Sequence, residues 1–462
     1  MGARVVRTNS GQFSGGTRRD DSELHDALDR LIRKHRVPGA QLAVVGSPLD
    51  RGDDLVIGVG EQEVGTGRLV TRDARFPIGS IGKTFTATLA MLLVADGDLD
   101  LDDPVADQLP QLPAGAPVTL RQLLSHTSGL VDEPGAAEPG RVGRAGYVLD
   151  AWRTGPMFPP GSAFSYSNAG YVLVGHLVEQ ITGMSWWEAV QTLLLGPLGI
   201  SPAFVVGPAR STVGGFVPGH AVSPARSSAI PVQQTMAPAE APVGALALSA
   251  ADLVRYAGLH LRGESGGPVA VLDAGTLARM REAVPAADPF GFADGWASGL
   301  AVYRHRDRNW FGHDGTGDGT SCHLRFDPAG GIAVALTTNC TTGAALWPDV
   351  VDELRTAGID VGDYAGPATP GPDARRPLPP ECAGTYRNGA RVYRVAADPD
   401  GRTILHVAGK PHSRLVVRDD LTFTTHDLRT GEPTPPGRFT RDPRTARMDR
   451  LLVTGRLAIR DR

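Results

Sequence analysis

The sequence lacks the marks of several large classes of protein. Its 462 residues carry a formal net charge of only −4, so it has neither the basic surplus that holds nucleic acid nor an acidic run. No segment approaches the roughly 20 apolar residues of a membrane-spanning helix, and residues 1–20 contain no apolar stretch of the length that a secretory signal needs. We therefore expect a cytoplasmic protein with no nucleic-acid partner and no membrane partner.

Cysteine and metal-binding patterns are also scarce. Cys322, Cys340 and Cys382 make an odd number scattered over a long chain, which favours reduced thiols over a disulfide framework. No group of His, Cys and carboxylate residues has the spacing of a metal site, and no Gly-rich phosphate loop follows a strand. We expect no metal and no cofactor.

Lysine is nearly absent. Of the 46 basic residues, only Lys34, Lys83 and Lys410 are lysine. Arginine keeps its charge under all ordinary conditions, whereas a lysine amine can lose its proton. Lys83 lies in a stretch that is otherwise apolar, so its presence there suggests a need for an amine that can ionise.

The length and the composition divide the chain into segments. A chain of 462 residues exceeds what one hydrophobic core usually organises. Residues 365–380 are so rich in proline that they read as a linker, and the Gly-, Ser- and Arg-rich residues 1–20 as a disordered tail. Between them, residues 21–364 form the main domain. Residues 381–462 contain many short alternating stretches, which predict a small β-barrel.

Within the main domain, helical spacing is clear in residues 21–36 and 80–96. Strands are predicted early, at 40–45 and 54–60, and late, at 299–303, 322–326 and 332–338. This order predicts an α/β (α+β) fold in which both ends of the domain build one sheet with helices on its faces. The Pro-, Gly- and Ser-rich stretch 201–243 is expected to be a long loop that covers the site or walls in a substrate.

One pair of residues suggests catalysis. Ser80 and Lys83 are three residues apart at the start of a predicted helix, so their side chains share one face and can hydrogen-bond. A serine needs a neighbouring base to become a good nucleophile, and a desolvated lysine can be that base. The helix N-terminus adds N–H groups for a developing oxyanion. Alone, this spacing also occurs by chance on surface helices.

Several further segments give the pair a context. The chain resembles the serine β-lactamase and penicillin-binding-protein superfamily, and the matching segments occur in the order that the family has. The resemblance is nearest to the class C-like esterases, D-peptidases and related transferases. The fold implied is an antiparallel sheet flanked by helices, with a helical subdomain. The matching segments are PIGSIGKTFTA, GDLDLDDPVADQLP, LRQLLSHTSGL, FSYSNAGYVLVG and GHDGTGDG.

The resemblance assigns roles to the second motif, Tyr166-Ser167-Asn168. Tyr166, held close to Lys83, would relay the proton of Ser80 and later protonate the leaving group. Asn168 would orient Lys83 and donate to a substrate amide. Without the resemblance, the same residues read as a loop tyrosine and a turn asparagine.

The third motif is His313-Asp314-Gly315, where many relatives have Lys-Thr-Gly. The resemblance implies that His313 tunes Tyr166 or contacts a substrate carboxylate, and that the Thr316 N–H joins that of Ser80 as the oxyanion hole. Asp314 and Gly315 would lie beside the substrate, and Gly315 would let it approach the strand closely. A neutral histidine at this position argues against a classical β-lactamase.

His126 offers a competing Ser-His pair, but the resemblance gives it a structural role. The C-terminal segment, with CAGTYRN near its start, resembles the lipocalin-like barrel that follows the catalytic domain in some of these peptidases, esterases and peptide cyclases. Its arginines would bind a peptide carboxylate, or the barrel would only stabilise the domain.

The resemblance extends to stand-alone penicillin-binding-protein-type thioesterases. These release non-ribosomal peptides and cyclise them head to tail, starting from a peptidyl thioester that often ends in a D-residue. We expect this activity, with a peptidyl (thio)ester or small ester as substrate and a carrier protein of a peptide synthetase as a possible partner. The alternatives are a cytosolic esterase or D-aminopeptidase/DD-peptidase that uses water, and a catalytically silent scaffold or binding protein of the same fold.

Overall fold

The computed structural model describes residues 21–461, except for 47–53, 113–116, 135–142, 207–214, 224–227, 263–270, 367–376, 429–430, 432 and 444. The tail expected at 1–20 and most of the linker expected at 365–380 lie outside the described residues. The expected boundaries at 21–364 and 381–462 stay predictions. The described α-helices and strands before the linker end at Thr356, and after it a 3₁₀ turn, Pro380–Cys382, leads into the first barrel strand at Gly384.

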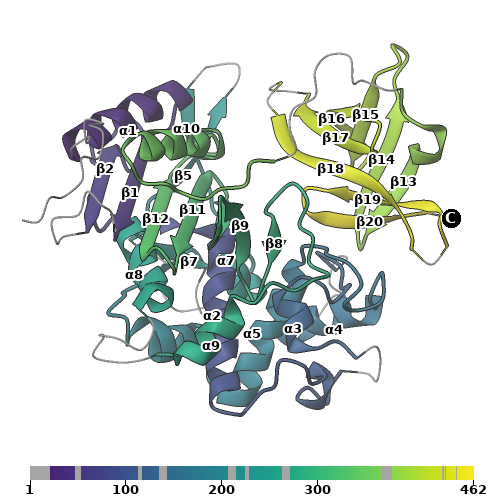
Figure 1. The fold of residues 1–462 in the computed structure, drawn as a ribbon, viewed down its shortest axis with the longest axis horizontal. Coiled ribbons are helices and arrows are strands. Elements are labelled where there is room, and N and C mark those ends of the chain that lie inside the picture. Colours follow the sequence, from purple (N-terminus) through teal and green to yellow (C-terminus); the bar gives the residue numbers. More distant parts are fainter. Residues whose placement is uncertain are drawn as a thin grey trace, which may run out of the picture.

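The main sheet is antiparallel and has seven strands (Figure 1), in the order β2-β1-β12-β11-β10-β9-β8. β1 pairs with β12 from Ala40 opposite Thr338 to Val45 opposite Ala333, so distant parts of the chain lie side by side. The fold class expected from the sequence is therefore confirmed. The strands are β1 Gly39–Val45, β2 Leu55–Gly60, β8 Gly295–Trp296, β9 Ala301–His305, β10 Arg308–Gly317, β11 Thr320–Asp327 and β12 Ile332–Thr338.

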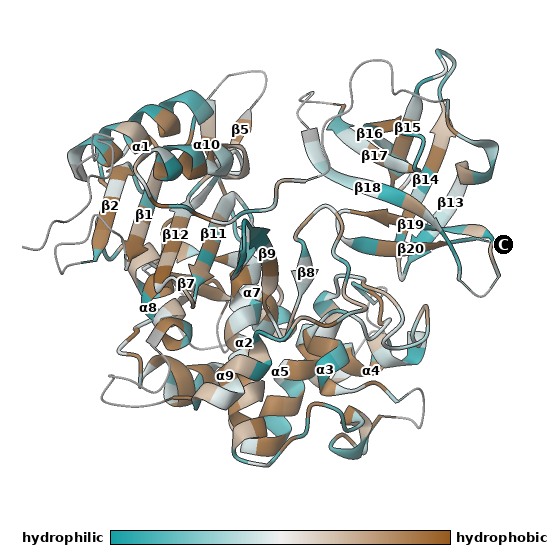
Figure 2. Ribbon diagram, viewed as in Figure 1, coloured by the Kyte–Doolittle hydropathy of each residue, from teal (hydrophilic) through white to brown (hydrophobic). Residues whose placement is uncertain are grey.

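Alternate side chains of the central strands feed two separate cores. Leu42, Val44 and Leu336 pack with α1 (Asp21–His35) and α10 (Gly343–Thr356), while Ala43 and Ala335 belong to a second core with α8 (Ala250–Arg262). This period of two is the signature of a sheet buried on both faces. Figure 2 shows the resulting brown strands between helices of mixed colour.

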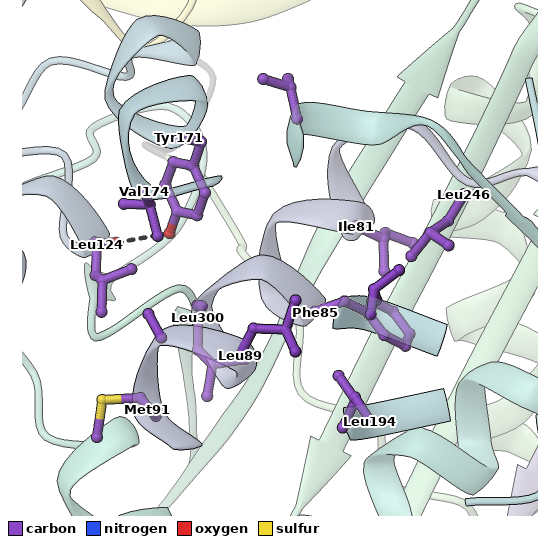
Figure 3. Close-up of a cluster of buried hydrophobic side chains, with 14 of the residues drawn as sticks. Ile81, Phe85, Leu89, Met91, Leu124, Tyr171, Val174, Leu194, Leu246 and Leu300 are labelled. Atoms are coloured by element: carbon purple, nitrogen blue, oxygen red, sulfur yellow. Dashed lines mark hydrogen bonds between the residues drawn. The ribbon is translucent and has the colours of Figure 1, made fainter. Parts of the chain in front are cut away.

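The helical subdomain surrounds α2 (Gly82–Ala95), which is apolar nearly all round and therefore needs cover on every side. Figure 3 shows Phe85, Leu89 and Met91 of α2 among side chains from several other elements, and Tyr171 donating to the Leu124 carbonyl. The buried cluster fixes the axis of α2 and hence the position of its first turn. The neighbouring helices are α3 Leu120–Leu124, α4 Arg144–Thr154, α5 Asn168–Thr182, α6 Trp186–Ala189, α7 Ala241–Gly244 and α9 Ala274–Met280.

The stretch 201–243 differs from the long loop expected. Its described part contains a hairpin of β5 (Gly219–Ser223) and β6 (Ser228–Val232), and β4 (Ala203–Phe204) joins a small sheet with β3 (Phe76–Pro77) and β7 (Leu246–Leu248). Short strands broken by glycine and proline show too little periodicity to be read from the sequence.

The C-terminal segment forms a closed barrel of eight antiparallel strands, which confirms the predicted barrel; its likeness to lipocalins stays a prediction. The alternating stretches in the sequence are at 384–386, 393–396, 404–407, 415–417, 421–424, 437–441 and 448–453, and they overlap seven of the eight strands; β20 was missed. Apolar side chains, including Tyr386, Phe423 and Phe439, fill the interior. The strands are β13 Gly384–Asn388, β14 Arg391–Ala397, β15 Thr403–Val407, β16 Lys410–Val417, β17 Thr422–Asp427, β18 Pro433–Arg441, β19 Met448–Val453 and β20 Arg456–Arg460.

The barrel docks on the segment that leads into α5. The Tyr166 N–H donates to the Gly455 carbonyl at 2.8 Å, and Ser165 Oγ accepts from the Leu457 N–H at 3.1 Å. The turn between β19 and β20 is thus hydrogen-bonded directly to the second motif. In the described part of the chain, no helix has both the length and the apolar character to cross a membrane.

Candidate active site

A cavity of about 370 Å³ lies where the edge of β10, the start of α2, the segment before α5 and the barrel meet. Five residues singled out by sequence line it: Ser80, Tyr166, His313, Asp314 and Thr316. None of the described residues of 201–243 lines it, so the described part of that stretch does not form the expected substrate wall. The barrel supplies part of the wall instead, through Pro435 and Arg456.

Two close backbone approaches place the nucleophile against β10. Ser80 lies in a 3₁₀ turn, Gly79–Ile81, and Gly79 has φ +51° with its would-be Cβ only 2.4 Å from the Thr316 carbonyl oxygen. A Cβ on Gly315 would lie 1.8 Å from the Ile78 carbonyl oxygen. The side-chain-free face of Gly315 therefore receives the nucleophile segment, and both glycines are needed to bring Ser80 beside Thr316.

Lys83 is fully buried on the first turn of α2. Its Nζ lies 2.9 Å from Ser80 Oγ, 3.4 Å from the Val243 carbonyl oxygen and 4.9 Å from the centre of the Tyr166 ring. Burial holds the pKa of this amine well below the ordinary lysine value, and the positive charge of Arg456 lowers it further while Asp132 opposes the shift. A neutral Lys83 amine can accept the Ser80 proton.

Tyr166 lies beside the same pair. Its side chain is hydrogen-bonded to that of Ser80, but burial still raises its pKa above the ordinary value of 10.0. The phenol is therefore protonated at neutral pH, which fits Lys83 as the base and Tyr166 as a proton donor or relay; these roles stay predictions. The His126 ring packs on Tyr166 with ring centres 4.2 Å apart.

His126 has a positioning role, as the resemblance implied. Its backbone is in the left-handed region, with φ +58°. Nδ1 accepts from the Ser167 N–H at 3.1 Å, so this nitrogen carries no proton. The ring thus holds the second motif and leaves Ser80 to Lys83.

His313 is buried, and desolvation followed by the nearby charge of Lys83 lowers its pKa to about 3. The ring is neutral at physiological pH. Nδ1 lies 2.6 Å from the Asp314 carbonyl oxygen, so Nδ1 bears the hydrogen and Nε2 is a bare acceptor. Nε2 has no partner among the described residues, and the residue lines the cavity, so it can accept a hydrogen bond from a bound molecule.

Asn168 is held through its backbone, whose N–H donates to Asp132 Oδ1 at 3.0 Å. Its side-chain Oδ1 is buried and unpartnered in the described part of the chain. Among the described residues, no hydrogen bond joins the amide to Lys83, so the orienting role expected for Asn168 stays a prediction. The free amide oxygen is suited to accept from Lys83 or from a substrate amide.

Sequence reasoning missed Arg456 on β20. Its guanidinium Nε donates to Asp132 Oδ2, and its central carbon lies 5.4 Å from the centre of the Tyr166 ring. Asp132 is almost wholly buried, and its backbone N–H donates to Asn388 Oδ1 of the barrel at 2.8 Å. One carboxylate thus joins the barrel to the start of α5. No sequence motif marks this pair.

Asp314 lines the cavity and belongs to a charged network on β10 and β11. Its Oδ1 accepts from Arg325 Nη1 at 2.7 Å and lies 2.8 Å from His323 Nδ1. Burial would raise the pKa of this carboxyl, but Arg325 and His323 outweigh burial and hold it below its usual range. Asp314 is therefore a carboxylate.

The arrangement suits acyl transfer through a serine ester and provides no evident metal site. Within the part of the chain that the structure describes, no three His, Cys, Asp or Glu residues are grouped as metal ligands. Cys322, Cys340 and Cys382 are all buried free thiols.

Comparisons with known proteins point the same way. The family model described as Beta-lactamase matches residues 24–354. Penicillin-binding protein 4 of Amycolatopsis lactamdurans is 35% identical over 387 residues, which cover 79% of this chain and 97% of that protein.

Solved structures extend the similarity over the barrel. The crystal structure of SurE has 38% sequence identity and a TM-score of 0.83, and the match covers 96% of this chain and 99% of that one. A structure of SurE with D-Leu matches at 37% identity and a TM-score of 0.79. A D-stereospecific amidohydrolase from Streptomyces sp. matches at 26% identity with a TM-score of 0.56, over 72% of this chain and 98% of that one.

Proposed function

Because this chain belongs to the β-lactamase family of serine enzymes, we propose that it is an acyltransferase that cyclises a peptidyl thioester with a D-configured C-terminal residue. Ser80 takes the peptide as an ester, and the peptide's own N-terminal amine releases it as a head-to-tail ring. The thioester would be carried by a peptide synthetase, and the enzyme would act in the cytoplasm.

The first step forms the serine ester. Neutral Lys83 takes the proton of Ser80 as Oγ attacks the thioester carbonyl, and the N–H groups of Ser80 and Thr316 would bind the oxyanion. When the tetrahedral intermediate collapses, the C–S bond breaks. The proton held by Lys83 passes through Tyr166 to the departing thiolate, which leaves as a thiol.

The second step reverses these roles. A neutral amine attacks the ester carbonyl, so that a C–N bond forms and the bond from carbon to Ser80 Oγ breaks. Tyr166 and Lys83 remove the extra proton from the nitrogen and return it to Oγ. The products are an amide and the free serine, with no water consumed.

The observation that carries the choice of amine over water is the barrel wall. Arg456 and Pro435 of the barrel line the cavity together with Trp296 and Phe292 of the catalytic domain. A site covered by another domain and lined by aromatic rings favours a bound amine over bulk water. Arg456 also lies within reach of the acyl group, where its guanidinium can bind a peptide carbonyl.

The preference for a D-residue rests on relatives. SurE has been crystallised with D-Leu, and the Streptomyces protein is named as D-stereospecific. Both share the catalytic fold with this chain. The same likeness supports hydrolysis of D-peptides or D-amides as the competing activity.

The test uses a peptidyl thioester analogue that ends in a D-residue, with Ser80→Ala as the control. We expect mass spectrometry to detect a product lighter by one water than the linear acid, formed only by the wild type. Linear acid alone would overturn the cyclase proposal and favour a D-peptidase or esterase. If neither product forms and a fluorophosphonate fails to label Ser80, the site is silent and the protein is a scaffold.

A further inference from the structure

The Ser80 cavity continues past His313 and Asp314 to a region that the acyl-transfer steps leave unused. The lining there comes from β11, α10 and the segment that follows α10: Arg325, Trp347, Asp363 and Tyr364.

Within this region, Asp314 offers a free carboxylate oxygen. Its Oδ1 is taken by His323 and Arg325, whereas no described residue donates to Oδ2. The Asp314 side chain is 44% exposed, although that of Arg325 behind it is only 1% exposed. Asp314 lines the cavity that Ser80 also lines, so its carboxylate is accessible to a molecule bound there.

The network behind Asp314 leaves one carboxylate oxygen unused. Arg325 lies between two carboxylates, donating to Asp314 and, through Nε and Nη2, to Asp363 Oδ1 at 3.0 and 2.7 Å. Asp363 Oδ2 accepts from Trp347 Nε1 at 2.9 Å. Both oxygens of Asp363 are therefore used within the protein, which leaves Asp314 Oδ2 as the oxygen of this pair of carboxylates to which no described residue donates.

The network is also rigid. The Arg325 guanidinium lies 3.8 Å from the centre of the Tyr303 ring, and the His323 ring is parallel to that of Trp347 with centres 4.8 Å apart. Tyr364 is fixed by its hydroxyl, which accepts from the Gly291 N–H at 3.1 Å. Side chains locked in this way present a preformed site, which lowers the entropic cost of binding.

A second acceptor lines the same cavity. His313 is 3% exposed, and its Nε2 has no partner among the described residues. A free carboxylate oxygen, a bare imidazole nitrogen and neighbouring aromatic rings together suit a cation that donates hydrogen bonds.

We propose that Asp314 and His313, with the aromatic wall of Trp347 and Tyr364, bind the N-terminal ammonium group of the peptide. The inference rests on the proposed acyl transfer and adds the site that binds the acceptor amine before it attacks. Binding is non-covalent: the ammonium docks at Asp314 while the C-terminal carbonyl is at Ser80, which brings the two ends of the peptide together. The amine then loses one proton to solvent and attacks the ester as the neutral form.

The experiment compares three peptidyl thioesters that differ only at the N-terminus. One has a free amine, one is acetylated, and one carries a trimethylammonium group, which keeps the charge but cannot attack. The readout is kcat/KM for thiol release, because this ratio reports acylation of Ser80 and does not depend on how the ester is later released. The enzymes are the wild type, Asp314→Asn and Asp360→Asn.

For the wild type we expect acetylation to lower kcat/KM about tenfold, as the loss of one ion pair in a partly closed site would. The trimethylammonium peptide keeps the charge but cannot donate hydrogen bonds, so its kcat/KM should lie between those of the free amine and the acetylated peptide. Asp314→Asn should remove the difference among the three peptides. Asp360 pairs with His305 at 2.8 Å and does not line the cavity, so Asp360→Asn should behave as the wild type.

Equal values for the three peptides with the wild type would overturn the inference, as would a difference that persists in Asp314→Asn. The wild-type comparison stands by itself if Asp314→Asn does not fold. If the wild type releases no thiol from any of the peptides, it is the proposed function that fails. Thiol release with equal kcat/KM values leaves that function intact and removes only the ammonium site.

Discussion

The catalytic domain and the barrel contribute to one cavity in different ways. The catalytic domain supplies Ser80, Lys83 and Tyr166, each fixed by elements with large buried cores. The barrel supplies wall residues and one charged group, Arg456, at the end of a tight turn. The contrast fits the proposal that the first domain carries the chemistry and that the barrel selects among acyl groups and acceptors.

The two regions meet at Asp132. This buried carboxylate receives the Arg456 guanidinium and also accepts from the Asn168 N–H that begins α5. Removing the Arg456 guanidinium should therefore affect both the docking of the barrel and the electrostatics of Lys83. Removing the Ser80 hydroxyl should abolish the reaction and leave the docking of the barrel intact.

Ser80→Ala gives the largest expected effect. Because the serine oxygen forms the covalent bond, kcat/KM for p-nitrophenyl butyrate should fall at least about a thousandfold. The melting temperature should stay near that of the wild type, since Ser80 is only partly buried. Substantial residual turnover would place the chemistry elsewhere in the molecule.

Tyr166→Phe comes next. It keeps the ring that packs on His126 and removes the hydroxyl that relays protons, so kcat should fall about a hundredfold. Labelling of Ser80 by a fluorophosphonate should slow by much less, because its fluoride leaving group does not need to be protonated by Tyr166. An unchanged kcat would remove Tyr166 from the mechanism.

Arg456→Met tests the barrel side. It leaves Asp132 buried without its guanidinium, which should lower the free energy of unfolding by about 3 kcal/mol, measured by urea denaturation. Activity on p-nitrophenyl butyrate should fall less than activity on a peptidyl thioester. Equal losses on both substrates would contradict a selective role for the barrel.

The pH profile follows from the charge state of Lys83. The amine must be neutral to take the Ser80 proton, so kcat/KM should rise as pH increases through the lowered pKa of Lys83. Below that pKa the ammonium form is inactive, and above it the rate should level off. Arg456 is one cause of the lowering, so the rising limb of Arg456→Met should move to higher pH; a shift to lower pH would exclude this charge effect.

The smallest effect on stability is expected at the solvent-exposed rim of the contact between the barrel and the catalytic domain. Arg391 donates to Glu133 at 2.8 Å, but the two side chains are 31% and 45% exposed, so solvent screens the pair. A double-mutant cycle with Arg391→Ala and Glu133→Ala should give a coupling below about 1 kcal/mol. A larger coupling would mean that the rim, as well as the Asp132–Arg456 contact, holds the barrel.

Much of the catalytic domain could be predicted from the sequence because its signals are local. The spacing of Ser80 and Lys83 places them together on one helix, as observed. Thr119 caps α3 in a capping box with Gln122, and Ser249 does the same for α8 with Asp252. The motif order also led to Tyr166 and His313.

Other elements could not be read in this way. β10 carries the third motif, but apolar and polar residues do not alternate regularly in its sequence, RNWFGHDGTG. The reason is that this strand lines the cavity and does not simply cover one buried face. α10 contains Pro348, which argues against a helix in isolation. Tertiary packing overrides both local signals.

The contact between Asp132 and Arg456 was beyond prediction for a different reason. It joins residues 324 positions apart, and it depends on β20, a strand of five residues that follows the turn at Gly455. Strand signals of that length are weak, and a buried ion pair between domains has no local signature. The same holds for the network behind Asp314.

The central claim is that a water-poor cavity holds the acyl group on Ser80 for an amine. The most direct test is intact-mass analysis of the protein mixed with an N-acetylated peptidyl thioester that ends in a D-residue and cannot cyclise. We predict an adduct equal to the peptide acyl group, mapped to Ser80 by peptide sequencing, that persists over many turnover times of the free-amine peptide. Absence of the adduct, or its conversion to linear acid as fast as the free-amine peptide turns over, would contradict the account.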